Sequence, residues 1–178
     1  MPNLSILVKK IIYFHELGDY YTCYSTIVEN EDTLLENFPQ FFVEVLKIYY
    51  NMLLGNYDKI SLESINRVID DYTNIDDNNN YKIVVNLVLL KYAYYKIQEE
   101  ANFKQSSMYS KIYSVLTTSP HSLHILEKLI KRVGIESVNN TSIHLDYKNI
   151  HIESLINLFD CHIFSVYLNY MMMGEIDE

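Results

Sequence analysis

The stretch from residue 14 to residue 21, Phe-His-Glu-Leu-Gly-Asp-Tyr-Tyr, stands between two segments of regular apolar spacing. The segments Leu4–Glu16 and Tyr20–Glu29 both place apolar residues at the three- and four-residue intervals of a helix face. Glycine readily adopts a positive φ and so ends a helix, and a following polar residue caps the next helix. The stretch therefore predicts a helical hairpin that turns at Gly18 and Asp19.

A second stretch, residues 51 to 58, has the same layout and reads Asn-Met-Leu-Leu-Gly-Asn-Tyr-Asp. Gly18 and Gly55 are 37 positions apart (55 minus 18), which lies within the range of helical-repeat periods. Residues 101 to 103, Ala-Asn-Phe, look like a degenerate third copy with alanine in place of glycine. The chain is thus predicted to contain an internal repeat of helical hairpins.

These Gly-(Asp/Asn)-Tyr turns resemble the inter-helix turn of tetratricopeptide-like repeats, over about residues 4–116. Cys23 falls where that family has a small residue that allows close helix approach. Ile60 and Ser64 do not fit the small and aromatic positions of the second copy, and no copy has the family's Trp or closing Pro. The resemblance implies stacked antiparallel hairpins whose groove binds a peptide or a partner helix.

The rest of the chain also has mainly helical periodicity, and scarce Gly and Pro favour an all-α fold with about seven or eight helices. Further helices are predicted at about Phe41–Leu54, Ser61–Asp71, Tyr81–Glu99, Lys104–Leu116, residues 119–134 and Ile152–Met173. Linkers or loops are predicted at residues 29–36, 70–80 and 135–148, the last with a short hairpin as an alternative. We expect one domain over residues 1–178, with C-terminal helices in 119–173 and an acidic tail at 174–178.

The segment Tyr81–Glu99 is apolar on nearly every side. Its polar residues Asn86, Lys91 and Lys96 come five apart and so define no single wet face. Such a helix is expected to be surrounded by others, which favours the alternative fold, an irregular bundle around a central apolar helix. On this helix alone, the chain is similar to virus-encoded regulators that resemble apoptosis-inhibiting bundle proteins.

Composition argues against several classes of partner. The formal net charge of −9 disfavours nucleic acid, because such binding depends on clustered Lys and Arg. No apolar run reaches the roughly 20 residues of a membrane span. Cys23 and Cys161 stand alone in apolar patterns typical of buried reduced thiols, and the start of the chain lacks a signal-peptide layout. We expect a cytoplasmic or nuclear protein.

Candidate catalytic and metal sites fail on geometry or ligand number. His121 and His124 are spaced to share a metal, but no third ligand accompanies them. Cys161 and His162 are adjacent and would point about 100° apart on a helix, so they cannot form a nucleophile–base pair. The sequence predicts no enzyme, no metal and no cofactor.

Tyrosine is the remaining feature, with 17 residues and no Trp, so most of these rings are expected in the core. Two clusters favour a binding surface instead, because Tyr anchors interfaces and Met adapts to them. The candidate partner-binding residues are Tyr92, Tyr94, Tyr95, Tyr167, Tyr170, Met171 and Met172. The predicted function is a non-enzymatic adaptor or scaffold, a subunit of a larger complex that binds another protein.

Overall fold

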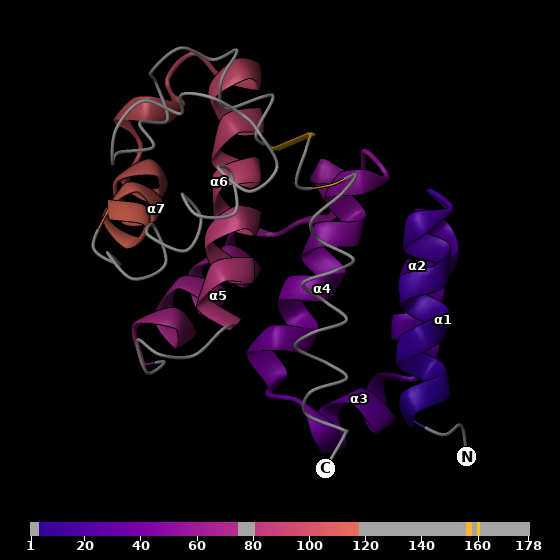
Figure 1. The fold of residues 1–178 in the computed structure, drawn as a ribbon. Helices are drawn as coiled ribbons and strands as arrows, with labels where there is room; N and C mark the ends of the chain where they lie inside the picture. The colour runs from indigo at the N-terminus through magenta and orange to yellow at the C-terminus, as the bar shows by residue number, and fades with distance from the viewer. Residues whose placement is uncertain (1–3, 75–80, 118–155, 158–159, 161–178) are drawn as a thin grey trace, which may run out of the picture. The chain divides into compact units, whose positions relative to one another are not determined.

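The computed structural model describes residues 4–74, 81–117, 156–157 and 160 (Figure 1). The elements of these residues are helices and turns without a strand, which confirms the all-α fold class for this part of the chain. Two compact units are present, residues 1–65 with 158–178 and residues 66–157, and each is described by itself. The organisation as a single domain stays a prediction.

The first unit is built from an N-terminal helical hairpin and two further helices. Its elements are α1 (Leu4–Glu16), α2 (Tyr20–Glu29), α3 (Glu31–Asn37), α4 (Gln40–Leu53), the 3-10 turn η1 (Tyr57–Lys59) and the start of α5 (Leu62–Thr73). Helices α1 and α2 pack side by side, and α2 also packs against α4, which α3 contacts in turn (Figure 1). The first two helices have the predicted bounds.

The turn between α1 and α2 has the predicted geometry. Gly18 has a φ of 79°, and its N–H donates to the carbonyl of His15 at 3.0 Å. The Asp19 N–H donates to the carbonyl of Phe14 at 2.9 Å, which completes a Schellman motif. The Asp19 carboxylate then accepts from the N–H of Thr22 at 3.1 Å and caps α2. Backbone carbonyls at the end of α1 and a backbone N–H at the start of α2 therefore find hydrogen-bond partners within a single short turn.

The turn after α4 repeats the first half of this geometry. Gly55 has a φ of 78° and donates to the carbonyl of Met52 at 3.0 Å, while Asn56 donates to that of Asn51 at 2.8 Å. The two glycines therefore occupy equivalent turns. The continuation differs, because η1 follows this turn and the hydroxyl of Ser61 caps α5.

The third copy lacks a glycine turn but shares that continuation. After Ala101 and Asn102 comes the 3-10 turn η2 (Phe103–Gln105), and the hydroxyl of Ser106 then accepts from the N–H of Tyr109 to cap the next helix. The second and third linkers therefore share their ending, a 3-10 turn followed by a serine cap. The first and second linkers share their beginning, a glycine turn at the helix end. The repeat is local, and a tetratricopeptide-like stacking of whole hairpins stays a prediction.

The core of the first unit lies around α4. Its buried residues form two adjacent stripes, Val45, Ile48 and Met52 on one and Phe42, Leu46 and Tyr49 on the other, and α4 packs against both α2 and α3. At the ends of the stripes, Phe41 and Leu53 are only partly buried.

Helix α3 occupies residues that the sequence predicts to be a linker. Glu31 and Asp32 lie in its first turn, where carboxylates favour the positive end of the helix dipole. Leu34 is fully buried and anchors α3 to the core. The prediction of a linker over residues 29–36 is wrong, because one buried leucine in an acidic segment is too weak a periodic signal to reveal a short helix.

Two further bounds differ from expectation. Helix α5 continues to Thr73, into the predicted loop of residues 70–80, and the Thr73 hydroxyl donates to the carbonyl of Asp70 at 2.7 Å. The predicted helix from Lys104 begins later, at Ser107, because η2 precedes it. The predictions for 75–80, 119–134 and 135–148, and nearly all of that for 152–173, lie outside the described residues.

The second unit contains α6 (Tyr81–Glu99), with the predicted bounds, and α7 (Ser107–Thr117), which packs against it. Residues 84 to 90 of α6 are buried without interruption, so nearly two turns are covered on every side. The predicted burial is confirmed for this part of the helix, while residues 94–99 are partly or fully exposed. Within this unit the burial fits the alternative fold, a bundle around a central apolar helix.

We expect Gly18→Ala to lower the free energy of unfolding by about 1–2 kcal/mol, because alanine at positive φ is strained. A Cβ at this position would meet no atom within 4 Å, so the loss reports backbone strain alone. Urea denaturation of Gly18→Ala and of Gly18→Asn measures it, and asparagine, which tolerates this conformation, should lose less. Equal stability of wild type and Gly18→Ala would contradict the assignment.

Candidate functional site

A cluster of buried polar side chains joins three parts of the first unit. Nδ1 of His15 lies 3.0 Å from the Tyr50 hydroxyl, and Nε2 lies 2.9 Å from the carbonyl oxygen of Asp160. The Tyr49 hydroxyl donates to Oδ1 of Asp160 at 2.5 Å. Because a carbonyl only accepts, Nε2 carries the proton of a neutral imidazole, and the Tyr50 hydroxyl donates to Nδ1.

Burial keeps the phenols and the imidazole of the cluster uncharged, and also the thiol of Cys23 on α2. It lowers the pKa of His15 and raises the pKa values of Tyr49 and Tyr50 well above their usual range. Burial also raises the pKa of the Cys23 thiol to about 12, and this thiol donates to the carbonyl of Ile11. Because only a thiolate is an effective nucleophile, Cys23 in this setting is a packing residue. This confirms its prediction as a buried free thiol; Cys161 lies outside the described residues.

Sequence reasoning misses this cluster. One signal is present, since His15 follows Ile11 by four residues and therefore falls on the buried face of α1. Its partner Asp160 is 145 positions away, and no local pattern joins the two.

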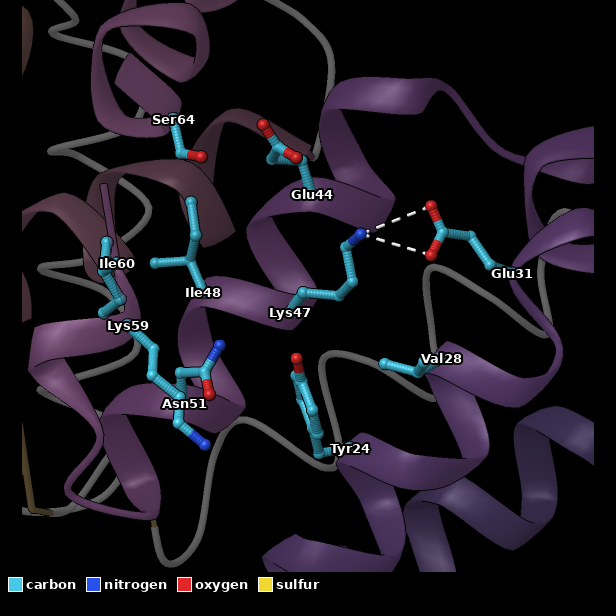
Figure 2. Close-up of a pocket in the computed structure, with 10 residues that line it drawn as sticks. All are labelled: Tyr24, Val28, Glu31, Glu44, Lys47, Ile48, Asn51, Lys59, Ile60 and Ser64. Carbon is cyan, nitrogen blue, oxygen red and sulfur yellow. Dashed lines mark hydrogen bonds and ion pairs between the residues drawn. The ribbon is translucent and has the colours of Figure 1, made fainter. Parts of the chain in front are cut away.

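A groove of about 260 Å³ opens in the first unit and is the candidate binding site (Figure 2). It draws side chains from α2, α3, α4, η1 and the first residues of α5. The lining residues are Tyr24, Val28, Glu31, Glu44, Lys47, Ile48, Asn51, Lys59, Ile60 and Ser64. Those from Glu44 to Asn51 recur at intervals of three and four and so form one face of α4.

The groove combines apolar walls with one buried amide. Ile48 and Ile60 are buried, and Val28 at the rim is 44% exposed. Asn51 is only 8% exposed, and its side-chain amide is directed from α4 toward Tyr24 (Figure 2). A buried amide has its full stabilising effect only when its donors and acceptor are hydrogen-bonded. The groove therefore combines a buried hydrogen-bonding amide with apolar side chains and with a larger number of polar and charged ones.

An ion pair forms one edge of the groove. Nζ of Lys47 on α4 lies 3.2 Å from both carboxylate oxygens of Glu31 on α3 (Figure 2). Such a partly exposed pair contributes at most about 1 kcal/mol to stability. Its main effect is to neutralise these two charges at the rim; Glu44 and Lys59 are the other charged residues that line the groove.

The predicted partner-binding tyrosines do not form one surface. Tyr92 is fully buried, so its prediction as a binding residue is corrected: a ring inside α6's covered face cannot reach a partner. Tyr94 and Tyr95 are partly buried and stay predictions. The other candidates, Tyr167, Tyr170, Met171 and Met172, lie outside the described residues.

The described part of the chain also bears on metal sites and membrane spans. No group of three His, Cys, Asp or Glu side chains there is arranged to hold a metal ion. No helix there combines the length and apolar character needed to cross a membrane. His121, His124, Cys161 and His162 lie outside the described residues.

Comparison with protein-family models, with curated proteins and with solved structures finds no match for the chain.

We expect stability to fall as pH decreases from 7 toward 5. The pKa of His15 is lowered in the folded state, so below the ordinary value of 6.5 the unfolded chain binds a proton that the native state does not. Stability is lost from that pH downward until the native pKa is reached, by at most about 1.4 kcal/mol per pH unit for one proton. Urea titrations at several pH values measure the slope.

His15→Gln provides the control for this slope, because glutamine has a donor and an acceptor but does not titrate. Its stability should change less between pH 7 and pH 5 than that of the wild type. Identical slopes for the two proteins would show that His15 titrates normally.

We also expect Cys23 to resist alkylation in the native protein. Its thiol stays protonated at pH 8, because burial raises its pKa to about 12, and the side chain is fully buried. Iodoacetamide treatment in native and in denaturing buffer, read by mass spectrometry of the peptide that contains Cys23, measures the protection. Equal labelling in both buffers would contradict the burial.

Proposed function

We propose that the chain is a non-enzymatic protein-interaction module, an adaptor or scaffold subunit, that binds a short peptide segment of a partner in the groove of Figure 2. The observation that carries this proposal is the buried amide of Asn51 in a groove that also exposes the apolar side chains of Tyr24 and Val28. Such an arrangement is typical of sites where a few polar groups orient a ligand and apolar walls supply affinity.

The chemistry of the Asn51 amide matches a peptide backbone. An asparagine side chain offers two donors and one acceptor, and a peptide unit offers one donor and one acceptor. A segment bound in an extended conformation can therefore pair the donor and the acceptor of its backbone with the side-chain amide of Asn51. Recognition of this kind is independent of the partner's side chains and fixes its direction in the groove.

The apolar walls supply the selectivity. Tyr24, Ile48 and Ile60 form the apolar part of the lining of a space of about 260 Å³, which suits one side chain rather than a folded domain. Because the Lys47–Glu31 pair is neutralised, neither charge at that edge strongly favours a charged partner. We infer a partner segment with an exposed apolar residue flanked by free backbone.

Selection of random twelve-residue peptides displayed on phage tests the proposal. Immobilised wild-type chain should enrich peptides that share an apolar residue, and Asn51→Ala should bind them at least about tenfold more weakly through loss of the amide contacts. Synthetic peptides and fluorescence polarisation provide the affinities. Failure to enrich any peptide reproducibly would overturn the proposal.

Two variants separate the groove from general effects on stability. Val28→Asp introduces a charge at the exposed rim, away from the core, and should weaken binding like Asn51→Ala. Asn102→Ala removes an exposed asparagine of the second unit and should bind like the wild type. If Asn102→Ala and Val28→Asp had equal effects, binding would not take place in the groove.

A further inference from the structure

Helix α1 has an apolar stripe on its solvent side. Ile6, Tyr13 and Leu17 are 66%, 58% and 62% exposed, the last of them one residue beyond the helix end. They follow one another at seven and four residues and so lie within about 40° around the helix axis. The buried residues of α1, which include Leu7 and Ile11, lie on the opposite side. α1 therefore presents an apolar surface away from its own core.

The charges beside this stripe are ordered. Lys9 and Glu16 are exposed and seven residues apart, so they lie on the same edge of the stripe. Lys10 is also exposed and lies on the other edge, three residues before Tyr13. Opposite charges are thus placed toward the two ends of one edge.

This order of charges makes the stripe complementary to itself. A two-fold axis perpendicular to two antiparallel helices brings the same edge of both copies together. Lys9 of one copy then faces Glu16 of the other, and the reverse pair forms by symmetry. A parallel pair would not bring these two residues to the same level, so the charges favour the antiparallel arrangement.

We propose that this face of α1 is a self-association surface that pairs with α1 of a second copy, antiparallel about a two-fold axis between residues 12 and 13. In this register Leu17 of one copy lies between Ile6 and Lys10 of the other. The Tyr13 rings of the two copies meet at the axis. The apolar contacts and both ion pairs form in one and the same register. For this reason we assign a second copy of the chain as the partner that covers this face.

The size of this face sets the strength of the association. A helix of 13 residues is about 20 Å long, so the pair of helices buries less area than a standard stable interface. The dimer is accordingly weak and reversible. It uses the outer face of α1 and not the lining residues of the groove, so it goes beyond the proposed function and is tested separately.

Sedimentation velocity of the full chain from about 10 µM to about 1 mM tests the proposal. The wild type should show a concentration-dependent shift from monomer to dimer. Leu17→Asp should weaken the dimer at least about tenfold, because it places a charge in the apolar contact. A wild type that stays monomeric over the whole range would overturn the proposal.

A charge exchange identifies the register. Lys9→Glu and Glu16→Lys should each weaken the dimer, and the double variant, with the two charges exchanged, should restore it. Lys104→Glu, which changes an exposed lysine of the second unit, is the matched control and should dimerise like the wild type. A double variant no stronger than the single variants would exclude the antiparallel register, and circular dichroism confirms that each variant is folded.

Discussion

The hydrogen bonds between His15, Tyr49, Tyr50 and Asp160 are the constraint on which the first unit depends. Each of these groups is buried, and a buried polar group left without a partner costs about 1–3 kcal/mol. Loss of one member therefore leaves another unsatisfied. Because Asp160 follows His15 by 145 positions, the cluster also fixes a late residue of the chain against its first helix.

The same helix carries the cluster and the groove. Tyr49 and Tyr50 project from α4 into the cluster, while Ile48 and Asn51 line the groove from another face of the helix. The orientation of α4 about its axis is thus set by the cluster, and with it the direction of the Asn51 amide. Residues of the cluster and residues of the candidate groove therefore stand next to one another in the chain.

The two units show different aspects of helical packing. In the first, two glycine turns with the same hydrogen bonds lead out of α1 and α4. In the second, residues 84–90 of α6 are buried on every side, as expected of a central helix in a bundle. Local turn chemistry is therefore repeated along the chain, while the burial of each helix is set by its own neighbours.

The sequence by itself determined the helical class, the bounds of α1, α2 and α6 and the two glycine turns, because periodicity and positive φ are local properties. It missed α3, whose single buried leucine gives no periodic signal, and it assigned Tyr92 to a surface. Only the tertiary structure decided that His15 meets Asp160 and that Asn51 faces a groove. Those contacts join residues far apart in the chain or depend on how a helix is rotated, and neither property is encoded in local spacing.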